Sequence, residues 1–270
     1  MNHTGPVGIV TGASSGIGME TAIALARKSY AVVLGARRAD KLAEVAGACE
    51  RAGGTARAIA TDVTQRGQVE ALVAAAVSEF GRVDVMVNNA GVGLFERVHE
   101  MSEADLRAIF EVNFFGLFYG CQAVAPLMMR QRSGHIFNVS SIIGKRGTPF
   151  HGAYCATKFA VCGLSDSMRV EMAPYRVRVT TVLPALTETE FFQQSKRGQA
   201  AGSSFQKFKG LMPASTVARK IVAAVGKNRP ELVISLGGKA LVALSAVSPR
   251  LIDWAMGMYH ADLMKRLKLE

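Results

Sequence analysis

The sequence predicts an α/β fold in which one doubly wound parallel sheet carries helices on both faces. Short apolar, β-branched runs alternate with longer segments of helical period along the 270 residues. Strands that are apolar throughout, separated by helices, are typical of a parallel sheet that is covered on both sides. No repeat, low-complexity linker or break in composition divides the chain, so a single domain is expected.

The expected elements differ in period and length. Buried strands are expected at Val7–Thr11, Ala31–Gly35, Arg57–Thr61, Val83–Asn88, His135–Ser140, Arg176–Leu183 and Leu232–Leu236. Helices are expected at Gly16–Lys28, Lys41–Ala52, Gln68–Phe80, Glu103–Arg130, Gly152–Met172 and Pro213–Gly226. Residues 1–237 then form the domain, and 238–270 add an amphipathic helical extension. The polar segment 187–212 is predicted to be a functional lid.

Composition excludes several classes of protein. Hydrophobic residues make up 49% of the chain, which is enough for a large core and too many for a disordered chain. No apolar run approaches the roughly 20 residues that a membrane span needs. The four cysteines form no C-x-x-C pair and the five histidines form no metal-binding pattern. We therefore expect free buried thiols, no metal site, no signal peptide and a cytoplasmic location.

The formal net charge of +11 is the unusual bulk property. A solvated basic surface is the favoured interpretation. The alternatives are an acidic substrate, an anionic cofactor, a carrier protein, a membrane surface or nucleic acid. A nucleic-acid partner is not expected, because no such motif is present and aromatic residues make up only 7%.

A glycine-rich run, T-G-A-S-S-G-I-G, spans Thr11–Gly18 between the first strand and the first helix. Gly12, Gly16 and Gly18 allow a tight turn and a close approach of the backbone to a pyrophosphate, and the helix N-terminus adds a positive dipole. A glycine turn in this position between strand and helix is typical of a Rossmann-type dinucleotide site.

The end of the second strand indicates which dinucleotide is bound. A fold that binds NAD usually places a carboxylate there to hold the ribose 2′-hydroxyl. Here Ala36 takes that place, and Arg37 and Arg38 follow. A guanidinium suits a 2′-phosphate in charge and in hydrogen-bond geometry, so NADP(H) is favoured over NAD. The alternative is that both arginines simply lie at the surface where the second helix begins.

Tyr154 and Lys158 are four residues apart in a predicted helix, so their side chains share one face. A nearby ammonium favours phenolate and is expected to lower the pKa of the tyrosine from its usual value of about 10. Tyr154 would then serve as a general acid for a developing alkoxide. A Y-x-x-x-K pair occurs easily by chance, and other motifs must accompany it to carry weight.

Several further motifs occur in a fixed order along residues 5–236. They are Asn88-Asn89-Ala90-Gly91, Asn113, and the run from Gly134 to Ser141, followed by Tyr154-Cys-Ala-Thr-Lys158. With the glycine turn, this set resembles the short-chain dehydrogenase/reductase family, in its single-domain group with a T-G-x-x-x-G-x-G turn. The joint occurrence favours a functional role for each motif over a turn, a cap or a buried polar group.

The resemblance implies roles for individual residues. Tyr154 would be the proton donor, Ser141 would hold the carbonyl oxygen, Lys158 would bind the nicotinamide ribose, and Asn113 would anchor a water leading to Lys158. The cofactor would be held by Gly12, Ser14, Ser15, Gly16, Ile17, Gly18, Arg37, Arg38, Asp62, Val63, Asn89, Ala90, Gly91, Tyr154, Lys158, Pro184, Thr187 and Thr189. The chain would therefore be an NADP-dependent enzyme, of carbonyl reductase or alcohol dehydrogenase type, and a homodimer or homotetramer.

One position departs from the family pattern. Pro184 is followed by Ala185, where the family usually has glycine, so the nicotinamide end is the least certain part of the comparison. The alternatives for function are a catalytically idle NADP-binding regulatory protein on the same fold, and NAD-dependent oxidation of an alcohol.

The substrate and the tail are less well defined by the sequence. We expect an apolar ketone or aldehyde between the lid, with its four phenylalanines, and a wall containing Lys145 and Arg146. An anionic head on the substrate is the alternative that these basic residues raise, and solvated basic side chains are favoured. The tail beyond Gly238 is expected to pack on its own domain or a partner subunit, and peripheral membrane contact is the alternative.

Overall fold

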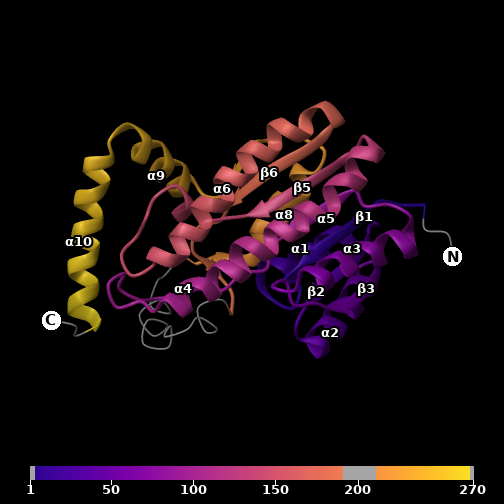
Figure 1. Cartoon of the computed structure of the whole chain (residues 1–270), viewed down its shortest axis with the longest axis horizontal. Helices are drawn as coiled ribbons and strands as arrows, with labels where there is room; N and C mark the ends of the chain where they lie inside the picture. Colours follow the sequence, from indigo (N-terminus) through magenta and orange to yellow (C-terminus); the bar gives the residue numbers. More distant parts are fainter. Residues whose placement is uncertain (1–3, 191–210, 268–270) are drawn as a thin grey trace.

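The centre of the molecule is a seven-stranded parallel sheet in the order β3-β2-β1-β4-β5-β6-β9 (Figure 1). The computed structural model describes residues 4–190 and 211–267. The strands are β1 Val7–Thr11, β2 Ala31–Ala36, β3 Thr55–Ala60, β4 Val85–Asn88, β5 Gly134–Val139, β6 Val177–Leu183 and β9 Glu231–Val233. The predicted α/β class and parallel sheet are confirmed.

Helices cover both faces because successive strand residues point to opposite sides. In β1, Val10 belongs to one apolar cluster and Ile9 to the other, and both are fully buried. The helices α1 Gly16–Ala26, α2 Ala39–Arg51 and α8 Ala214–Ala224 pack on the first cluster. The helices α3 Arg66–Phe80, α5 Gly116–Gln131 and α6 Gly152–Met172 pack on the second.

Two predicted strands differ from the structure. The run at Arg57–Thr61 is not a buried strand. β3 is the edge strand and its residues are exposed or half-buried, whereas Thr61, just after it, is buried. The last strand ends at Val233, before the predicted limit of Leu236. Leu236 instead begins a helix, since Ser235 accepts a hydrogen bond from the Gly238 amide and caps it.

The predicted helix Glu103–Arg130 is continuous but not uniform. It consists of α4 Glu103–Phe110, a π-helical turn at Glu111–Phe115, and α5. By length and composition alone, Glu103–Gln131 is long and apolar enough to cross a membrane. In the fold, α5 packs against α3, α6, β4 and β5, which is the environment of a core helix.

Two helices form the C-terminal tail, α9 Leu236–Val247 and α10 Pro249–Leu267. Helix α10 stands at one end of the molecule (Figure 1). Its buried residues include Ile252 and Leu263, whereas Leu251, Trp254 and Met258 are exposed. The tail is helical as expected, but α10 has apolar side chains on two opposite sides and not on one.

The strand order fixes where a ligand can bind. After β1 the chain builds β2 and β3 on one side of it, and it then crosses to the other side of β1 to form β4. In open α/β sheets this switch creates a crevice beyond the carboxyl ends of the strands. The short pair β7 Thr187–Glu188 and β8 Met212–Pro213 flanks this end after β6.

Candidate active site

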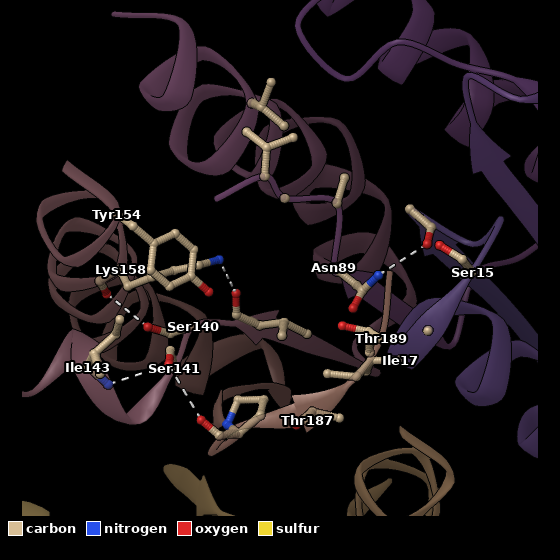
Figure 2. Close-up of a pocket in the computed structure, with 18 of the residues that line it drawn as sticks. Ser15, Ile17, Asn89, Ser140, Ser141, Ile143, Tyr154, Lys158, Thr187 and Thr189 are labelled. Carbon is tan, nitrogen blue, oxygen red and sulfur yellow. Dashed lines mark hydrogen bonds between the residues drawn. The ribbon is translucent and has the colours of Figure 1, made fainter. Parts of the chain in front are cut away.

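A cleft of about 510 Å³ lies at the carboxyl ends of β1, β4, β5 and β6. Figure 2 shows Tyr154, Lys158 and Ser141 on one side of it and Ser15 and Asn89 on the other. Of the predicted residues, those that line the cleft are Gly12, Ser14, Ser15, Gly16, Ile17, Arg37, Arg38, Asp62, Val63, Asn89, Ala90, Gly91, Ser141, Tyr154, Lys158, Pro184, Thr187 and Thr189. Gly18 and Asn113 lie behind this wall.

The glycine-rich turn needs its glycines for two different reasons. Gly12 has a φ of +64° and Gly16 a φ of +55°, which is the left-handed region that other residues rarely adopt. A Cβ at Gly18 would lie 2.3 Å from the carbonyl oxygen of Gly12. The turn is therefore folded tightly enough to present its backbone to the cleft.

The first turn of α1 faces the same space. Ser15 occupies the N-cap position, and its side chain makes no capping hydrogen bond to that turn. The amides at a helix N-terminus are ready to bind an anionic group. This geometry fits the pyrophosphate of a dinucleotide.

Arg38 lies over the glycine-rich turn. Its guanidinium donates to Ser14 Oγ at 3.1 Å and Ser15 Oγ at 3.0 Å, and it forms a 2.9 Å ion pair with Glu190. Arg37, in contrast, is exposed. Ala36 ends β2, and Arg37 and Arg38 supply cationic groups at this end of the cleft.

Asp62 and Asn89 also stabilise the loops that carry them. Asp62 Oδ1 accepts hydrogen bonds from the amide and the hydroxyl of Thr64, at 3.0 and 2.9 Å. Asn89 Nδ2 donates to the carbonyl oxygens of Thr11, at 3.0 Å, and Gly12, at 3.3 Å. The segment after β4 is thus fixed against the glycine turn, so that Asn89–Gly91 forms part of the cleft wall.

Asn113 is fully buried in the π-helical turn. Its Oδ1 accepts from the Val92 amide at 2.7 Å, and its Nδ2 donates to the Val92 carbonyl at 2.9 Å and to Thr157 Oγ1 at 3.2 Å. Asn113 therefore joins the helix to the segment after β4 and to α6. Inserted π-helical turns of this kind are frequent at functional sites.

Ser141, Tyr154 and Lys158 are brought together where β5 ends and α6 begins. The turn after β5 directs Ser141 into the cleft, and its hydroxyl hydrogen-bonds to Tyr154 and lies 3.4 Å from Pro184 O. Lys158 Nζ donates to Val139 O at 2.9 Å and lies 5.5 Å from the centre of the Tyr154 ring. One helical turn therefore places the phenol and the ammonium on the same wall.

The pKa values of this pair correct one expectation. Burial lowers the pKa of Lys158 from 10.5 to about 8. Burial, with a smaller contribution from Cys155, raises the pKa of Tyr154 above its usual value, and the hydrogen bond from Ser141 opposes this. Lys158 was expected to lower the pKa of Tyr154. In this structure desolvation of the phenolate is the largest influence on that pKa, and it acts in the opposite direction.

The segment after β6 runs along the cleft from Ser141 to the glycine-rich turn. Pro184 O accepts a hydrogen bond from the Ile142 amide at 3.0 Å, and Thr187 Oγ1 donates to Ala185 O at 2.8 Å. Thr189 approaches Gly16 so closely that a Cβ there would lie 2.9 Å from its methyl group. The segment holding Ala185 thus turns back towards the glycine loop.

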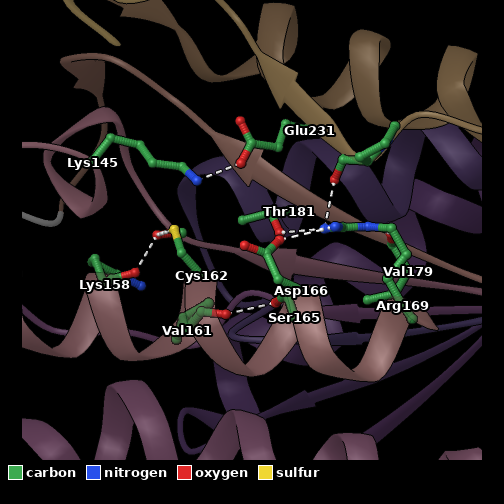
Figure 3. Close-up of polar contacts among 12 residues, drawn as sticks. Lys145, Lys158, Val161, Cys162, Ser165, Asp166, Arg169, Val179, Thr181 and Glu231 are labelled. Atoms are coloured by element: carbon green, nitrogen blue, oxygen red, sulfur yellow. Dashed lines mark hydrogen bonds and ion pairs between the residues drawn. The ribbon is translucent and has the colours of Figure 1, made fainter. Parts of the chain in front are cut away.

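Lys145 and Arg146 do not form the expected wall of the cleft. Lys145 forms an ion pair with Glu231 (Figure 3), and Arg146 pairs with Asp253 of α10. Both charges are thus neutralised within the fold, and neither residue lines the cleft. The phenylalanines and basic residues predicted for the lid, at 191–210, lie outside the described residues.

An apolar part of the cleft was not predicted from the sequence. It is lined by Val92, Ile142, Ile143, Leu241, Met256 and Tyr259, with Thr148 and His151 nearby. Helical spacing marked the tail residues as apolar, but nothing in the sequence places α9 and α10 beside the loop that follows β5. Within the described parts of the chain, no group of three His, Cys, Asp or Glu side chains could hold a metal ion.

The fold and the cleft are those of a Rossmann-type α/β protein in which the glycine-rich turn and the tyrosine–lysine pair line one cavity. Residues 6–200 match the family model described as short chain dehydrogenase. The chain therefore belongs to the short-chain dehydrogenase family and is an oxidoreductase of that family.

Individual relatives show what similar proteins bind and do. The 3-oxoacyl-[acyl-carrier-protein] reductase of Thermotoga maritima is 36% identical over 70% of this chain and 77% of its own length. A short-chain dehydrogenase/reductase from Burkholderia phymatum, solved with NAD, has a TM-score of 0.85 at 28% identity, covering 93% of this chain and 96% of that one. An alcohol dehydrogenase from Thermococcus sibiricus, solved with 5-hydroxy-NADP, has a TM-score of 0.75 at 30% identity, covering 84% and 95%. The family binds a nicotinamide cofactor.

Proposed function

We propose that this protein is an NADP(H)-dependent oxidoreductase that interconverts a carbonyl and an alcohol on an apolar substrate. The observation that carries the proposal is a single cleft with an anion-binding turn at one end and Ser141, Tyr154 and Lys158 at the other. Between them lies space for a dinucleotide, and beyond the tyrosine lies the apolar part of the cleft.

The residues present fit a dinucleotide. The turn that contains Gly12, Gly16 and Gly18 and the uncapped start of α1 would hold the pyrophosphate. When bound, the nicotinamide supplies or accepts the hydride. NADP(H) is favoured over NAD because Ala36 supplies no carboxylate for a 2′-hydroxyl and Arg38 lies above the same turn.

Proton transfer falls to Tyr154. Its raised pKa keeps the phenol protonated at neutral pH, so it can donate its proton to the substrate oxygen during reduction. Ser141 hydrogen-bonds to that phenol and would hold the same oxygen. Lys158 would bind the nicotinamide ribose, and its positive charge would stabilise the tyrosinate that forms. Asn113 supports this set through its hydrogen bond to Thr157, the neighbour of Lys158.

The apolar part of the cleft indicates the substrate class. Val92, Ile142, Ile143 and Met256 present aliphatic and thioether surface around the reacting end. Since Lys145 and Arg146 are occupied by carboxylates of the fold, the expected substrate is a ketone or aldehyde with an apolar body and no anionic head.

Titration of the purified protein with NADPH and with NADH, followed by nucleotide fluorescence, tests the cofactor proposal. We expect NADPH to bind at least tenfold more tightly, because a charge-assisted hydrogen bond contributes about 1.5–3 kcal/mol. The double substitution Ala36→Asp with Arg37→Leu should shift the preference towards NADH. Equal affinity for both nucleotides in the unmodified protein would contradict the preference for NADP(H), and tighter binding of NADH would point to an NAD-dependent enzyme instead.

A cytoplasmic homo-oligomer completes the proposal. All four cysteines are free and buried, as expected for a protein of a reducing compartment. Phe115 is partly exposed beside Phe114 and Tyr119, and Phe159 of α6 is 45% exposed. This aromatic surface supports contact with a second copy through α5 and α6.

A further inference from the structure

Helix α10 has two apolar faces that point in opposite directions. Ile252 and Leu263 are buried, and Met256 and Tyr259, on the same side of the helix, line the cleft. On the other side the exposed residues Leu251, Trp254 and Met258 follow one another at intervals of three and four. A surface helix of a globular protein typically has one apolar stripe, which faces the core. Trp254 is 63% exposed, so its face is not part of the core.

Helix α9 has the same property. Its exposed apolar residues are Leu236, Leu244 and Val247, with Ala240 and Ala243 between them at helical spacing. Leu236 and Val247 are 83% and 84% exposed. Half of the exposed large hydrophobic residues in the described part of the chain therefore lie within the two tail helices.

The exposed position of α10 is fixed by contacts on its inner side. Arg146 pairs with Asp253 and also donates to Pro249 O at 3.4 Å. The ring of His260 stacks on Phe150, with centroids 5.6 Å apart. These contacts hold α10 against the loop between Ser141 and Tyr154, so the outer apolar face is a feature of the docked helix.

Cations border the exposed apolar residues. Arg250 and Lys265 lie on the same side of α10 as Trp254, by helical spacing, and both are exposed. Lys239 is exposed on α9. The acidic residues of α10, Asp253 and Asp262, are paired with Arg146 and Arg266. The outer face is thus apolar at its centre and cationic at its ends, within a chain of net charge +11.

We propose that this outer face of α9 and α10 docks on an anionic lipid surface as a peripheral membrane contact. Tryptophan, leucine and methionine flanked by basic residues are what a helix lying in the lipid interface requires. Each lysine or arginine near an anionic surface strengthens binding by about 1 kcal/mol, which is about fivefold. A symmetric contact with a second copy is disfavoured, because antiparallel pairing of two α10 helices would bring Arg250 of each copy towards Lys265 of the other.

Docking would place the cleft beside the lipid. Leu241 of α9 and Met256 and Tyr259 of α10 line the cleft from the side opposite to the exposed face. An apolar carbonyl compound dissolved in the membrane would then reach Tyr154 past these helices, a consequence that rests on the proposed function. The docking itself does not depend on turnover and can be tested without it.

The single tryptophan of the chain, Trp254, provides the test. Its emission is recorded while vesicles of phosphatidylglycerol and phosphatidylcholine, or of phosphatidylcholine alone, are added to the full-length protein. We expect a blue shift and at least about tenfold tighter binding to the anionic vesicles, weakened by high salt. The substitution pair Leu251→Glu with Met258→Glu should weaken binding at least about tenfold, because it removes apolar contact and adds negative charge.

A matched control separates local docking from general charge. Ala71→Glu with Ala74→Glu makes the same change in net charge at exposed positions of α3 and should bind vesicles within about twofold of the unmodified protein. Three results would overturn the proposal: an emission spectrum unchanged by either vesicle, equal losses in both double variants, or a blue shift that grows with protein concentration without vesicles. The last result would assign the face to a second copy of the chain. NADPH binding to each variant, measured in parallel, reports separately on the cleft.

Discussion

Replacing Lys158 by methionine should stabilise the cofactor-free protein while abolishing turnover. Lys158 is buried, and its pKa falls from 10.5 to about 8. Because one pKa unit corresponds to 1.36 kcal/mol, a pKa lowered by about 2.5 means that keeping Lys158 charged destabilises the folded state by about 3 kcal/mol. Methionine fills a similar volume and loses the hydrogen bond to Val139 O, worth about 1 kcal/mol. The net gain of about 2 kcal/mol should raise Tm by about 5 °C.

The pH dependence distinguishes this cause from a packing effect. The folded state binds the Lys158 proton less tightly than the unfolded state does. The charged Lys158 therefore destabilises the fold in full below pH 8, its folded pKa, and this destabilisation disappears as the pH rises towards 10.5, its unfolded pKa. Thermal denaturation without cofactor should therefore show the Met variant well above the unmodified protein at pH 7 and close to it at pH 10. Lys227→Met, at an exposed position, should change stability by no more than about 0.5 kcal/mol. A Met variant that is less stable at pH 7, or a gain that is the same at both pH values, would refute the reasoning.

Three further predictions concern Arg38, His135 and Arg146. Arg38→Leu should weaken NADPH binding about 10- to 100-fold and NADH binding no more than about threefold, measured by fluorescence titration; equal losses would show that Arg38 only shapes the turn. Burial, with a smaller contribution from Arg178, lowers the pKa of His135 to about 3, so stability is lost as the pH falls from 6.5 towards 3. Between pH 7 and pH 4, the free energy of unfolding of the His135→Gln variant, measured by urea denaturation, should therefore fall by about 3 kcal/mol less than that of the unmodified protein. Equal decreases in the two proteins would contradict this. Arg146→Met breaks the ion pair to α10 and should speed amide exchange in 249–267; unchanged exchange would show that the pair does not hold the helix.

The sheet was predictable because its strands are apolar throughout. Val7–Thr11 has the same limits in the sequence prediction and in the structure, since it is buried on both faces and a glycine turn ends it. The strand at Arg57–Thr61 was wrongly expected to be buried. Its composition resembles that of its neighbours, and only the strand order shows that it lies at the edge of the sheet.

The site was predictable where its residues are close in sequence or fixed to strand ends. Tyr154 and Lys158 share a helical face, and the glycine turn follows β1 directly. The partners of Lys145 and Arg146 were not predictable, because Glu231 and Asp253 are 86 and 107 residues away and belong to the last strand and the tail. The raised pKa of Tyr154 also depends on burial that no local pattern contains.

The most direct test of the proposed chemistry is NADPH consumption across a panel of apolar ketones and aldehydes, with Tyr154→Phe beside the unmodified protein. The phenylalanine variant keeps the ring and lacks the proton that Tyr154 would donate. We expect NADPH-dependent reduction of at least one carbonyl, NADPH binding within about threefold in the variant, and a rate at least about 100-fold lower, as for loss of a general acid. Turnover that persists unchanged in Tyr154→Phe, or NADPH binding with no turnover of any carbonyl, would contradict the proposal.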